Sequence, residues 1–175
     1  MTAVEAYELT TRGGATDFAR VAAAWDAFGP WCLIGGLAVN HYVEPVYTLD
    51  ADIVVIAFRL PDLLAHLREE GFGIEEHPHS VNVHPPASDL RIQFTTDPRY
   101  QEFFSRAREA TVLGVTVKVA SRDDVTKGKL WAWSDPLRRL SKRKKDELDL
   151  IRLAEAHPQL LAFYPEELRR LFGRA

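Results

Sequence analysis

Cysteine is almost absent from the sequence, since Cys32 is the only one in 175 residues. A single thiol excludes a disulfide framework, and the apolar stretch 31–34 around it favours a buried structural thiol over a nucleophile. The chain also lacks the run of about 20 apolar residues that would span a bilayer. Residues 1–6 have neither the basic nor the apolar part of a secretory signal. These absences predict a soluble cytoplasmic protein with no membrane partner.

A strong net charge is missing as well. The formal charge of −3 gives no overall attraction to nucleic acid. The positive charge is nevertheless concentrated, because six basic residues fall within eight positions: Arg138, Arg139, Lys142, Arg143, Lys144 and Lys145. Such a cluster either meets the phosphates of a ligand or forms the solvated start of a helix.

The composition that remains is that of a compact domain, with 46% hydrophobic and 27% charged residues. No repeat, low-complexity tract or Gly/Ser linker divides the chain. We therefore predict one domain over residues 1–175, with a core that contains the sheet over 1–120 and a helical part over 121–175.

Apolar spacing predicts the elements of this domain. Helices are expected over residues 17–28 and 60–70, and strands over 31–34, 48–58, 72–76, 80–84 and 88–95, with a last strand or hairpin over 112–119 around Gly114. Asp97-Pro98 is expected to start a further helix, with Asp97 as its N-cap. From Ser121, whose Ser-x-x-Asp pattern resembles a capping box, the pattern is wholly helical. The predicted fold class is α+β, beginning as α/β: a mixed, mostly antiparallel sheet with helices on one side and a C-terminal helical layer.

Two acidic residues interrupt an otherwise apolar strand. Asp50 and Asp52 are two positions apart, and because strand side chains alternate, both carboxylates point to the same face. Burying them without partners would raise one pKa and cost free energy. A divalent cation removes that conflict, and carboxylate oxygens suit Mg²⁺, or Mn²⁺ in its place. The alternative is an exposed strand start whose two acids face water.

A Gly35-Gly36 pair precedes Asp50 by about 15 positions, between a predicted strand and a predicted helix. Small residues there allow backbone N–H groups to approach a phosphate, and the helix N-terminus adds a favourable partial charge. Together with the aspartate pair, this turn supplies a triphosphate cradle and a metal clamp, the two parts needed for nucleotidyl transfer.

A two-metal site needs a third carboxylate from a neighbouring strand. Asp89 shares a face with Arg91 and Gln93 in the predicted strand 88–95. We predict Asp89 as the third metal ligand or as the base for the incoming hydroxyl. The alternative is a half-buried strand with a polar outer face.

The helical part adds two candidates. Lys129 lies among large apolar residues, so its side chain either extends outward to solvent or reaches a triphosphate. Asp146 and Asp149 lie on one face of the next helix. The alternative for that helix is an ordinary surface helix, with i,i+4 ion pairs from Lys142 to Asp146 and from Lys145 to Asp149.

These patterns together resemble the nucleotidyltransferase superfamily that shares the DNA-polymerase-β palm, and most closely its AbiEii-type toxin branch. The resemblance covers residues 33–153 and consists of four ordered pieces: Leu33-Ile-Gly-Gly-Leu-Ala-Val-Asn-His-Tyr42, Thr48-Leu-Asp-Ala-Asp-Ile-Val-Val55, Lys127-Gly-Lys129-Leu-Trp-Ala-Trp133 and Arg143-Lys-Lys-Asp146-Glu-Leu-Asp149-Leu-Ile151.

The resemblance implies a role for each matching residue. Phosphate and metal roles fall to Gly35, Gly36, Thr48, Asp50 and Asp52, a third metal role to Asp89, and the C-terminal catalytic contributors are Lys129 and Asp146. The chain departs from the pattern in one respect, because relatives often carry an arginine shortly before the threonine and residues 44–47 contain none. Arg91, Arg143 or Lys129 is expected to contact the nucleotide instead.

The function implied is Mg²⁺-dependent transfer of a nucleoside monophosphate from an NTP to an acceptor. The toxin branch implies tRNA, another RNA or a protein as acceptor, and an antitoxin as partner. One alternative is a small antibiotic-modifying enzyme of the aminoglycoside type, which would need an acidic pocket. Another is a non-catalytic nucleotide-sensing or partner-binding module.

Overall fold

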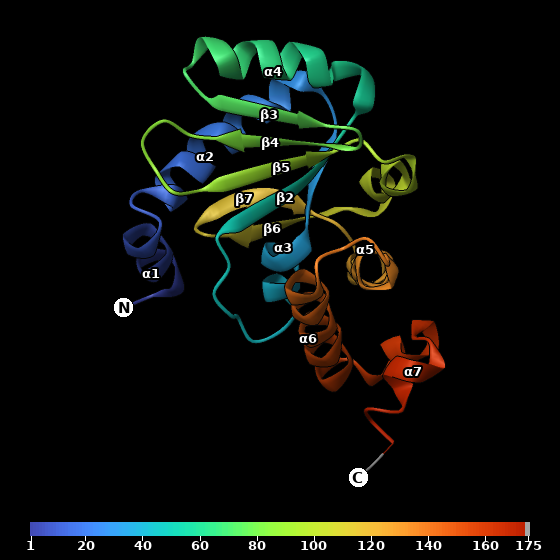
Figure 1. The fold of residues 1–175 in the computed structure, drawn as a ribbon. Helices are drawn as coiled ribbons and strands as arrows, with labels where there is room; N and C mark the ends of the chain where they lie inside the picture. Colours follow the sequence, from blue (N-terminus) through green and yellow to red (C-terminus); the bar gives the residue numbers. More distant parts are fainter. Residues whose placement is uncertain (174–175) are drawn as a thin grey trace.

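The computed structural model describes residues 1–173, which form helices around a seven-stranded sheet (Figure 1). The helices are α1 (Ala3–Thr10), α2 (Gly14–Trp25), α3 (Gly35–Tyr42), α4 (Leu60–Glu69), α5 (Arg122–Ser134), α6 (Leu140–Ala156) and α7 (Glu166–Arg169). The strands are β1 (Trp31–Ile34), β2 (Asp50–Val55), β3 (Gly73–His77), β4 (Ser80–His84), β5 (Arg91–Thr95), β6 (Arg108–Val112) and β7 (Val115–Val119). Short 3-10 helices are η1 (Asp26–Phe28), η2 (Ala57–Arg59), η3 (Pro98–Arg106) and η4 (Pro158–Phe163).

The strands lie in the order β3-β4-β5-β2-β1-β7-β6. The pairs β2/β5 and β1/β7 are parallel, and the other neighbouring strands are antiparallel. The mixed, mostly antiparallel sheet predicted from the sequence is therefore confirmed. Strand β2 lies in the middle of the sheet, where strands on both sides fix its register.

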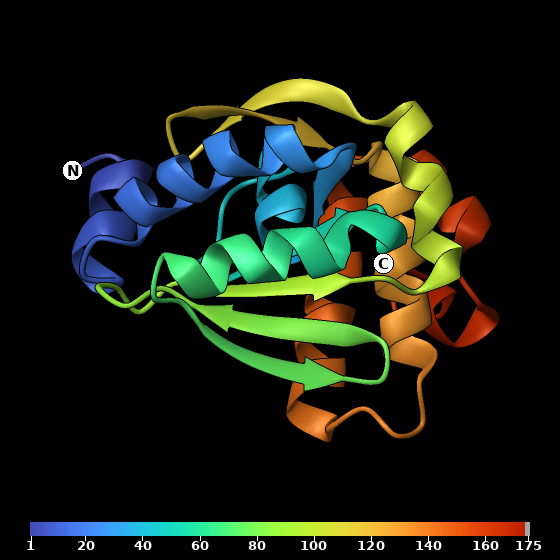
Figure 2. The same cartoon turned by 90° about the horizontal axis from the view of Figure 1, so that it is seen from above.

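One face of the sheet is the apolar core. Leu33, Ile53 and Phe94 occupy one row across β1, β2 and β5, and each is fully buried. Trp25 of α2 packs edge-on against Phe94, with ring centroids 5.5 Å apart. Figure 2 shows α2 and α4 lying across this face. Because side chains alternate along a strand, Asp52 points to the opposite face.

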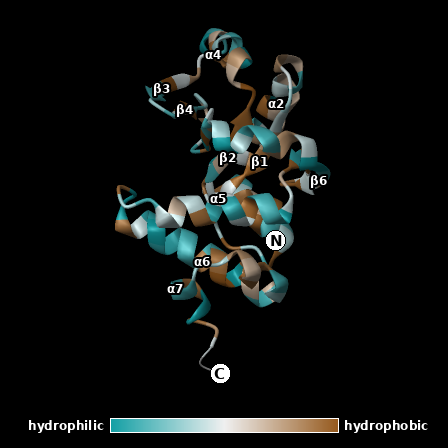
Figure 3. Cartoon of the chain, turned by 90° about the vertical axis from the view of Figure 1, so that its right-hand side faces the viewer, coloured by the Kyte–Doolittle hydropathy of each residue, from teal (hydrophilic) through white to brown (hydrophobic). Residues whose placement is uncertain are grey.

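That opposite face is covered by the C-terminal layer. Figure 1 shows α3, α5 and α6 together on this side of β2. In Figure 3 the hydrophobic residues are concentrated at the central strands, between the two groups of helices. No helix within residues 1–173 combines the length and the hydropathy required to cross a bilayer.

Local signals explain the helix starts that the sequence predicts. Ser121 caps α5, because its hydroxyl accepts a hydrogen bond from the backbone N–H of Asp124 at 3.2 Å. Asp97 caps η3 in the same way, accepting from the N–H of Arg99 at 3.0 Å. The hairpin around Gly114 is also confirmed, as β6 and β7.

Two strands are shorter than predicted. The expected strand 48–58 is β2, and Phe58 leaves the sheet into η2 with 74% of its surface exposed. The expected strand 88–95 begins only at Arg91. Its first residues are held elsewhere, because the backbone N–H of Asp89 donates to the carbonyl of Thr11 at 2.7 Å.

Replacing Phe94 tests which face of the sheet carries the core. We expect Phe94→Ala to lower the free energy of unfolding by about 3–5 kcal/mol, because the ring is fully buried against Trp25. Phe58→Ala is the matched control at an exposed position, with an expected change within about 0.5 kcal/mol. Urea unfolding of both variants measures the difference. Equal losses would contradict the assigned faces.

Candidate active site

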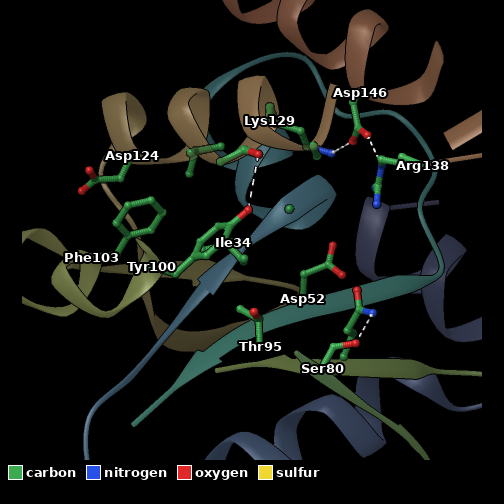
Figure 4. A pocket seen from close by; sticks show the side chains of 15 residues that line it. Ile34, Asp52, Ser80, Thr95, Tyr100, Phe103, Asp124, Lys129, Arg138 and Asp146 are labelled. Atoms are coloured by element: carbon green, nitrogen blue, oxygen red, sulfur yellow. Dashed lines mark hydrogen bonds and ion pairs between the residues drawn. The ribbon is translucent and has the colours of Figure 1, made fainter. Parts of the chain in front are cut away.

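Asp50 and Asp52 project from the same face of β2, as the sequence predicts. Asp52 lies opposite Ile34 of β1 and Gln93 of β5. The second carboxylate of the pair therefore has a strand on each side and is not at an exposed strand start. Figure 4 shows it pointing into a cavity between the sheet and α5.

The Gly35-Gly36 pair makes room for this carboxylate. Gly35 begins α3 directly after β1, with a φ of +67° that disfavours any residue with a side chain. A Cβ added there would lie 1.9 Å from Oδ2 of Asp52. A Cβ on Gly36 would lie 3.1 Å from Oγ1 of Thr48. The glycines thus bring the N-terminus of α3 against the aspartate, whether or not a phosphate binds there.

The surroundings of Asp52 disfavour the charged form of its carboxyl group. Burial and the charge of Asp50 raise the pKa of Asp52, while Lys129, Lys145 and Arg138 act in the opposite direction. Figure 4 draws no hydrogen bond or ion pair to the Asp52 carboxylate from the other residues shown. A carboxylate in this state is stabilised by an added cation.

Two lysines at the start of α6 approach the aspartate strand. Lys142 lies 3.3 Å from Oδ2 of Asp50, and Lys145 lies 3.2 Å from Oγ1 of Thr48. The i,i+4 pairs considered for this helix are therefore wrong, because both lysines reach across to the sheet. Residue Arg91 adds a third cation, 3.9 Å from Asp50.

Lys129 forms the centre of a buried charge network between α5 and α6. Its ammonium lies 3.0 Å from Oδ1 of Asp146 and 2.7 Å from Oδ2 of Asp149. Arg138 holds the other oxygen of Asp146 at 2.6 Å, and Arg152 holds that of Asp149 at 2.8 Å. Burial opposes the charge on Lys129, but the two aspartates outweigh it and raise the lysine's pKa. The network fixes an ammonium close to the aspartate pair.

The structure does not bring Asp89 to this site. Asp89 is exposed, and both of its carboxylate oxygens are held by Arg12. Gln93 is the residue of β5 in register with Asp52. Asp89 lies four positions before Gln93, which places it about 13 Å from Gln93 along the direction of the strand. The position beside Asp52 that a third carboxylate would take holds an amide instead.

Arg143 is also directed elsewhere, because its Nε donates to the backbone carbonyl of Trp133 at 3.0 Å. The basic residues of the 138–145 cluster that line the cleft are Arg138, Lys142 and Lys145 instead. The sequence singles out this basic cluster as either a phosphate contact or the solvated start of a helix. Lys142 and Lys145 contact residues 92 and 97 positions away, which local spacing does not predict.

The site opens into one cleft with two parts. Both parts are bordered by Asp52, Gln93, Lys129, Arg138 and Asp146. The first extends past Tyr100 and Phe103 of η3 (Figure 4). The second extends over the sheet and adds Gly36, Asp50, Glu75, Asn82, His84, Arg91, Ile92, Lys142 and Lys145.

The first part has an aromatic wall that sequence patterns did not reveal. Burial raises the pKa of Tyr100 to about 12. Its ring packs against α5 where Gly128 leaves space, since a Cβ there would lie 3.1 Å from Cε1 of the tyrosine. Gly128 belongs to the Lys127-Gly-Lys129 motif identified in the sequence, but its contact with Tyr100 follows only from the packing of η3 on α5.

The residues present fit a divalent metal ion whose remaining ligands come from the substrate. Within residues 1–173 no three His, Cys, Asp or Glu side chains form a metal-binding group. Mg²⁺ in phosphoryl-transfer sites is typically held by one or two carboxylates together with substrate phosphates and waters. Asp50 and Asp52 supply the two carboxylates, so the residues fit one ion well, and a third ligand for a second ion is not among them.

Comparison with solved structures identifies the fold. The chain is similar to the solution structure of the antibiotic-resistance factor ANT(2'')-Ia, with a TM-score of 0.63, 17% identity and 90% of each chain covered. The crystal structure of ANT(2'')-Ia in complex with adenylyl-2''-tobramycin matches with a TM-score of 0.60 and 18% identity, and the match covers 90% of this chain and 95% of that one. The lincosamide adenylyltransferase LnuA, with lincomycin bound, gives 0.55 and 13% identity over 81% of this chain and 96% of that one.

At these identities the similarity establishes the fold, which is the one that these nucleotidyltransferases share, as the resemblance implied. No protein-family model matches the chain, and no curated protein matches it by sequence. The assignment to the AbiEii-type branch stays a prediction.

Gly35→Ala tests the close approach of α3 to Asp52. An alanine in the left-handed region costs about 1–2 kcal/mol, and the clash with the carboxylate adds about 1–3 kcal/mol. Gly71→Ala is the control, because Gly71 also has a positive φ, +85°, but no atom within 4 Å of an added Cβ. Thermal unfolding compares the two. A Gly35 variant no less stable than the Gly71 variant would contradict the contact.

Lys129→Met tests the buried network. Removing the ammonium leaves Asp146 and Asp149 facing each other, and we expect a loss of about 3–5 kcal/mol in unfolding free energy. Lys127→Met removes a lysine from the same helix whose side chain is 42% exposed, with an expected change below about 1 kcal/mol. Denaturant titration measures both, and similar small losses would show that the network contributes little.

Proposed function

We propose that the protein is a nucleotidyltransferase that transfers a nucleoside monophosphate from an NTP to the hydroxyl of an acceptor. The observation that carries the proposal is the contact between the Asp52 carboxylate and the N-terminus of α3 at Gly35. It combines, at one point, a metal-binding anion and backbone N–H groups that favour a phosphate.

The cations around this point match the charge of a triphosphate. Lys142 and Lys145 approach from α6, and Lys129 from α5. All three line the same cleft as Asp50 and Asp52, where they can contact phosphate oxygens and the leaving pyrophosphate. Fixed cations of this kind stabilise charge without reorganising during the reaction.

In the proposed reaction the acceptor hydroxyl oxygen forms a bond to the α-phosphorus and releases its proton to water, and the bond from that phosphorus to the pyrophosphate oxygen breaks, so that pyrophosphate leaves. Asp50 and Asp52 would hold the divalent metal, Mg²⁺ or Mn²⁺. When bound, the metal supplies positive charge to the transferred phosphoryl group. Gly35 and Gly36 would orient the phosphates through α3, and Asp146 would keep Lys129 in place.

The acceptor distinguishes two versions of this function. The toxin version, with an RNA or protein acceptor and an antitoxin partner, rests on the sequence resemblance. A small-molecule version is favoured by the structural neighbours ANT(2'')-Ia, which is an antibiotic-resistance factor, and LnuA, an antibiotic adenylyltransferase. Of the basic cluster, Arg138, Lys142 and Lys145 line the cleft itself, where they would face the nucleotide in both versions.

Label transfer from each α-³²P-labelled NTP tests the proposal, with tRNA, protein extract and tobramycin as acceptors. We expect transfer in the presence of Mg²⁺ or Mn²⁺, its loss with EDTA, and about a 1000-fold decrease for Asp52→Asn. Asp62→Asn, an exposed acid on α4, is the control and should retain full activity.

Transfer that is equal in the Asp52 and Asp62 variants would contradict the assigned site. No transfer and no pyrophosphate release with any acceptor would instead favour the non-catalytic nucleotide-binding module.

A further inference from the structure

The cleft-facing side of β3, β4 and β5 carries polar side chains throughout. Cross-strand register places three rows on this face, which comprise Arg91, Gln93 and Thr95 of β5, Ser80, Asn82 and His84 of β4, and Glu75 and His77 of β3. The other face of the same strands carries Ile74, Val81, Val83, Ile92 and Phe94. The polar face is hereafter called the sheet wall.

The sheet wall is continuous with the aspartate pair. One row runs from Asp52 through Gln93 and Asn82 to Glu75, a span of three strand spacings or about 14 Å. Glu75, Asn82 and His84 line the same part of the cleft as Asp50 and Asp52. A molecule whose hydroxyl reaches the metal site would therefore lie along this row.

The groups along the row are hydrogen-bonding amides. Nε2 of Gln93 donates to Oδ1 of Asn82 at 3.3 Å and lies 3.4 Å from Oγ of Ser80. Nδ2 of Asn82 lies 3.2 Å from Nε2 of His77. Amides offer both donors and acceptors, which is what the hydroxyl groups of a polyol or sugar require.

The two sides of the cleft differ in charge. The cations Lys129, Lys142 and Lys145 belong to α5 and α6. On β3, β4 and β5 the only Lys or Arg is Arg91, which is already 3.9 Å from Asp50, and Glu75 adds a negative charge. A triphosphate matches the helical side, whereas the only Lys or Arg of the sheet wall is Arg91, which is paired with Asp50, so the wall offers little positive charge to the phosphates of a polynucleotide.

We propose that the sheet wall is the acceptor subsite, and that the acceptor is a hydroxyl-rich small molecule without negative charge. This inference rests on the proposed nucleotidyl transfer and specifies its acceptor. Gln93 and Asn82 bind the acceptor hydroxyls, and Glu75 binds the far end of the molecule, most strongly where it carries an ammonium group. The wall disfavours a polynucleotide, because its one Lys or Arg, Arg91, is paired with Asp50.

Side-chain amide signals in ¹⁵N NMR spectra of the full chain test this subsite. The Asn82 and Gln93 signals are assigned by their absence from Asn82→Asp and Gln93→Glu variants. With a non-hydrolysable ATP analogue and Mg²⁺ present, tobramycin or maltotriose should shift both signals in a saturable way, whereas total tRNA should not. The inference would be overturned if tRNA shifted the two signals, or if neither tobramycin nor maltotriose shifted them.

The same spectra separate this inference from the proposed function. The backbone amides of Gly35 and Gly36 report the nucleotide, so their failure to shift with the ATP analogue and Mg²⁺ would overturn the proposed function, and the inference with it. If the glycines shift but the two side-chain amides do not respond to either sugar, only the acceptor subsite is wrong.

Two glutamates next to each other on β3 provide a matched comparison. Glu75 faces the cleft, whereas Glu76 is on the opposite face and pairs with Arg68 of α4 at 2.7 Å. We expect Glu75→Gln to weaken tobramycin binding about two- to fivefold and Glu76→Gln to leave it unchanged. Equal effects of the two substitutions on the tobramycin Kd would overturn the assignment of the sheet wall.

Discussion

The repulsion between two carboxylates on one face of β2 is the constraint on which this site depends. Asp50 and Asp52 are held together by the sheet, which fixes both backbones, and are balanced by cations from another layer. Asp50 has partners in Lys142 and Arg91, whereas Asp52 points into the cleft beside Gly35. The site is therefore left with one carboxylate ready to accept a further positive charge, which is what a metal-bound nucleotide brings.

The C-terminal helices maintain this balance. Lys129 could not keep its charge in a buried position without Asp146 and Asp149, and those aspartates in turn need Arg138 and Arg152. Each charged residue of the network is paired with an opposite charge within it. The packing of α5 on α6 and the electrostatics of the cleft therefore depend on each other. The same helices give the cleft its asymmetry, with cations on the helical side and neutral amides on the sheet.

Sequence patterns predicted those parts of the structure that depend on local chemistry. The alternation along β2 placed both aspartates on one face, and the capping residues Ser121 and Asp97 located the starts of α5 and η3. The sequence identified the glycine pair, although for phosphate binding alone. The packing of Gly35 against Asp52 depends on the pairing of β1 with β2, which local sequence does not reveal.

The errors share a cause in long-range contacts. Asp89 has the right spacing for a third ligand, but Arg12, 77 positions away, holds it outside β5. Lys142 has the right spacing for a pair with Asp146, but reaches Asp50 across 92 positions instead. In both cases a contact between distant segments outweighed the weak preference of local spacing.

The most direct test of the account is the position of a metal ion in crystals grown with Mn²⁺ and a non-hydrolysable NTP analogue. We expect an anomalous peak shared by the carboxylates of Asp50 and Asp52, with the triphosphate at the N-terminus of α3. A bound nucleotide whose manganese lies away from both aspartates would contradict it.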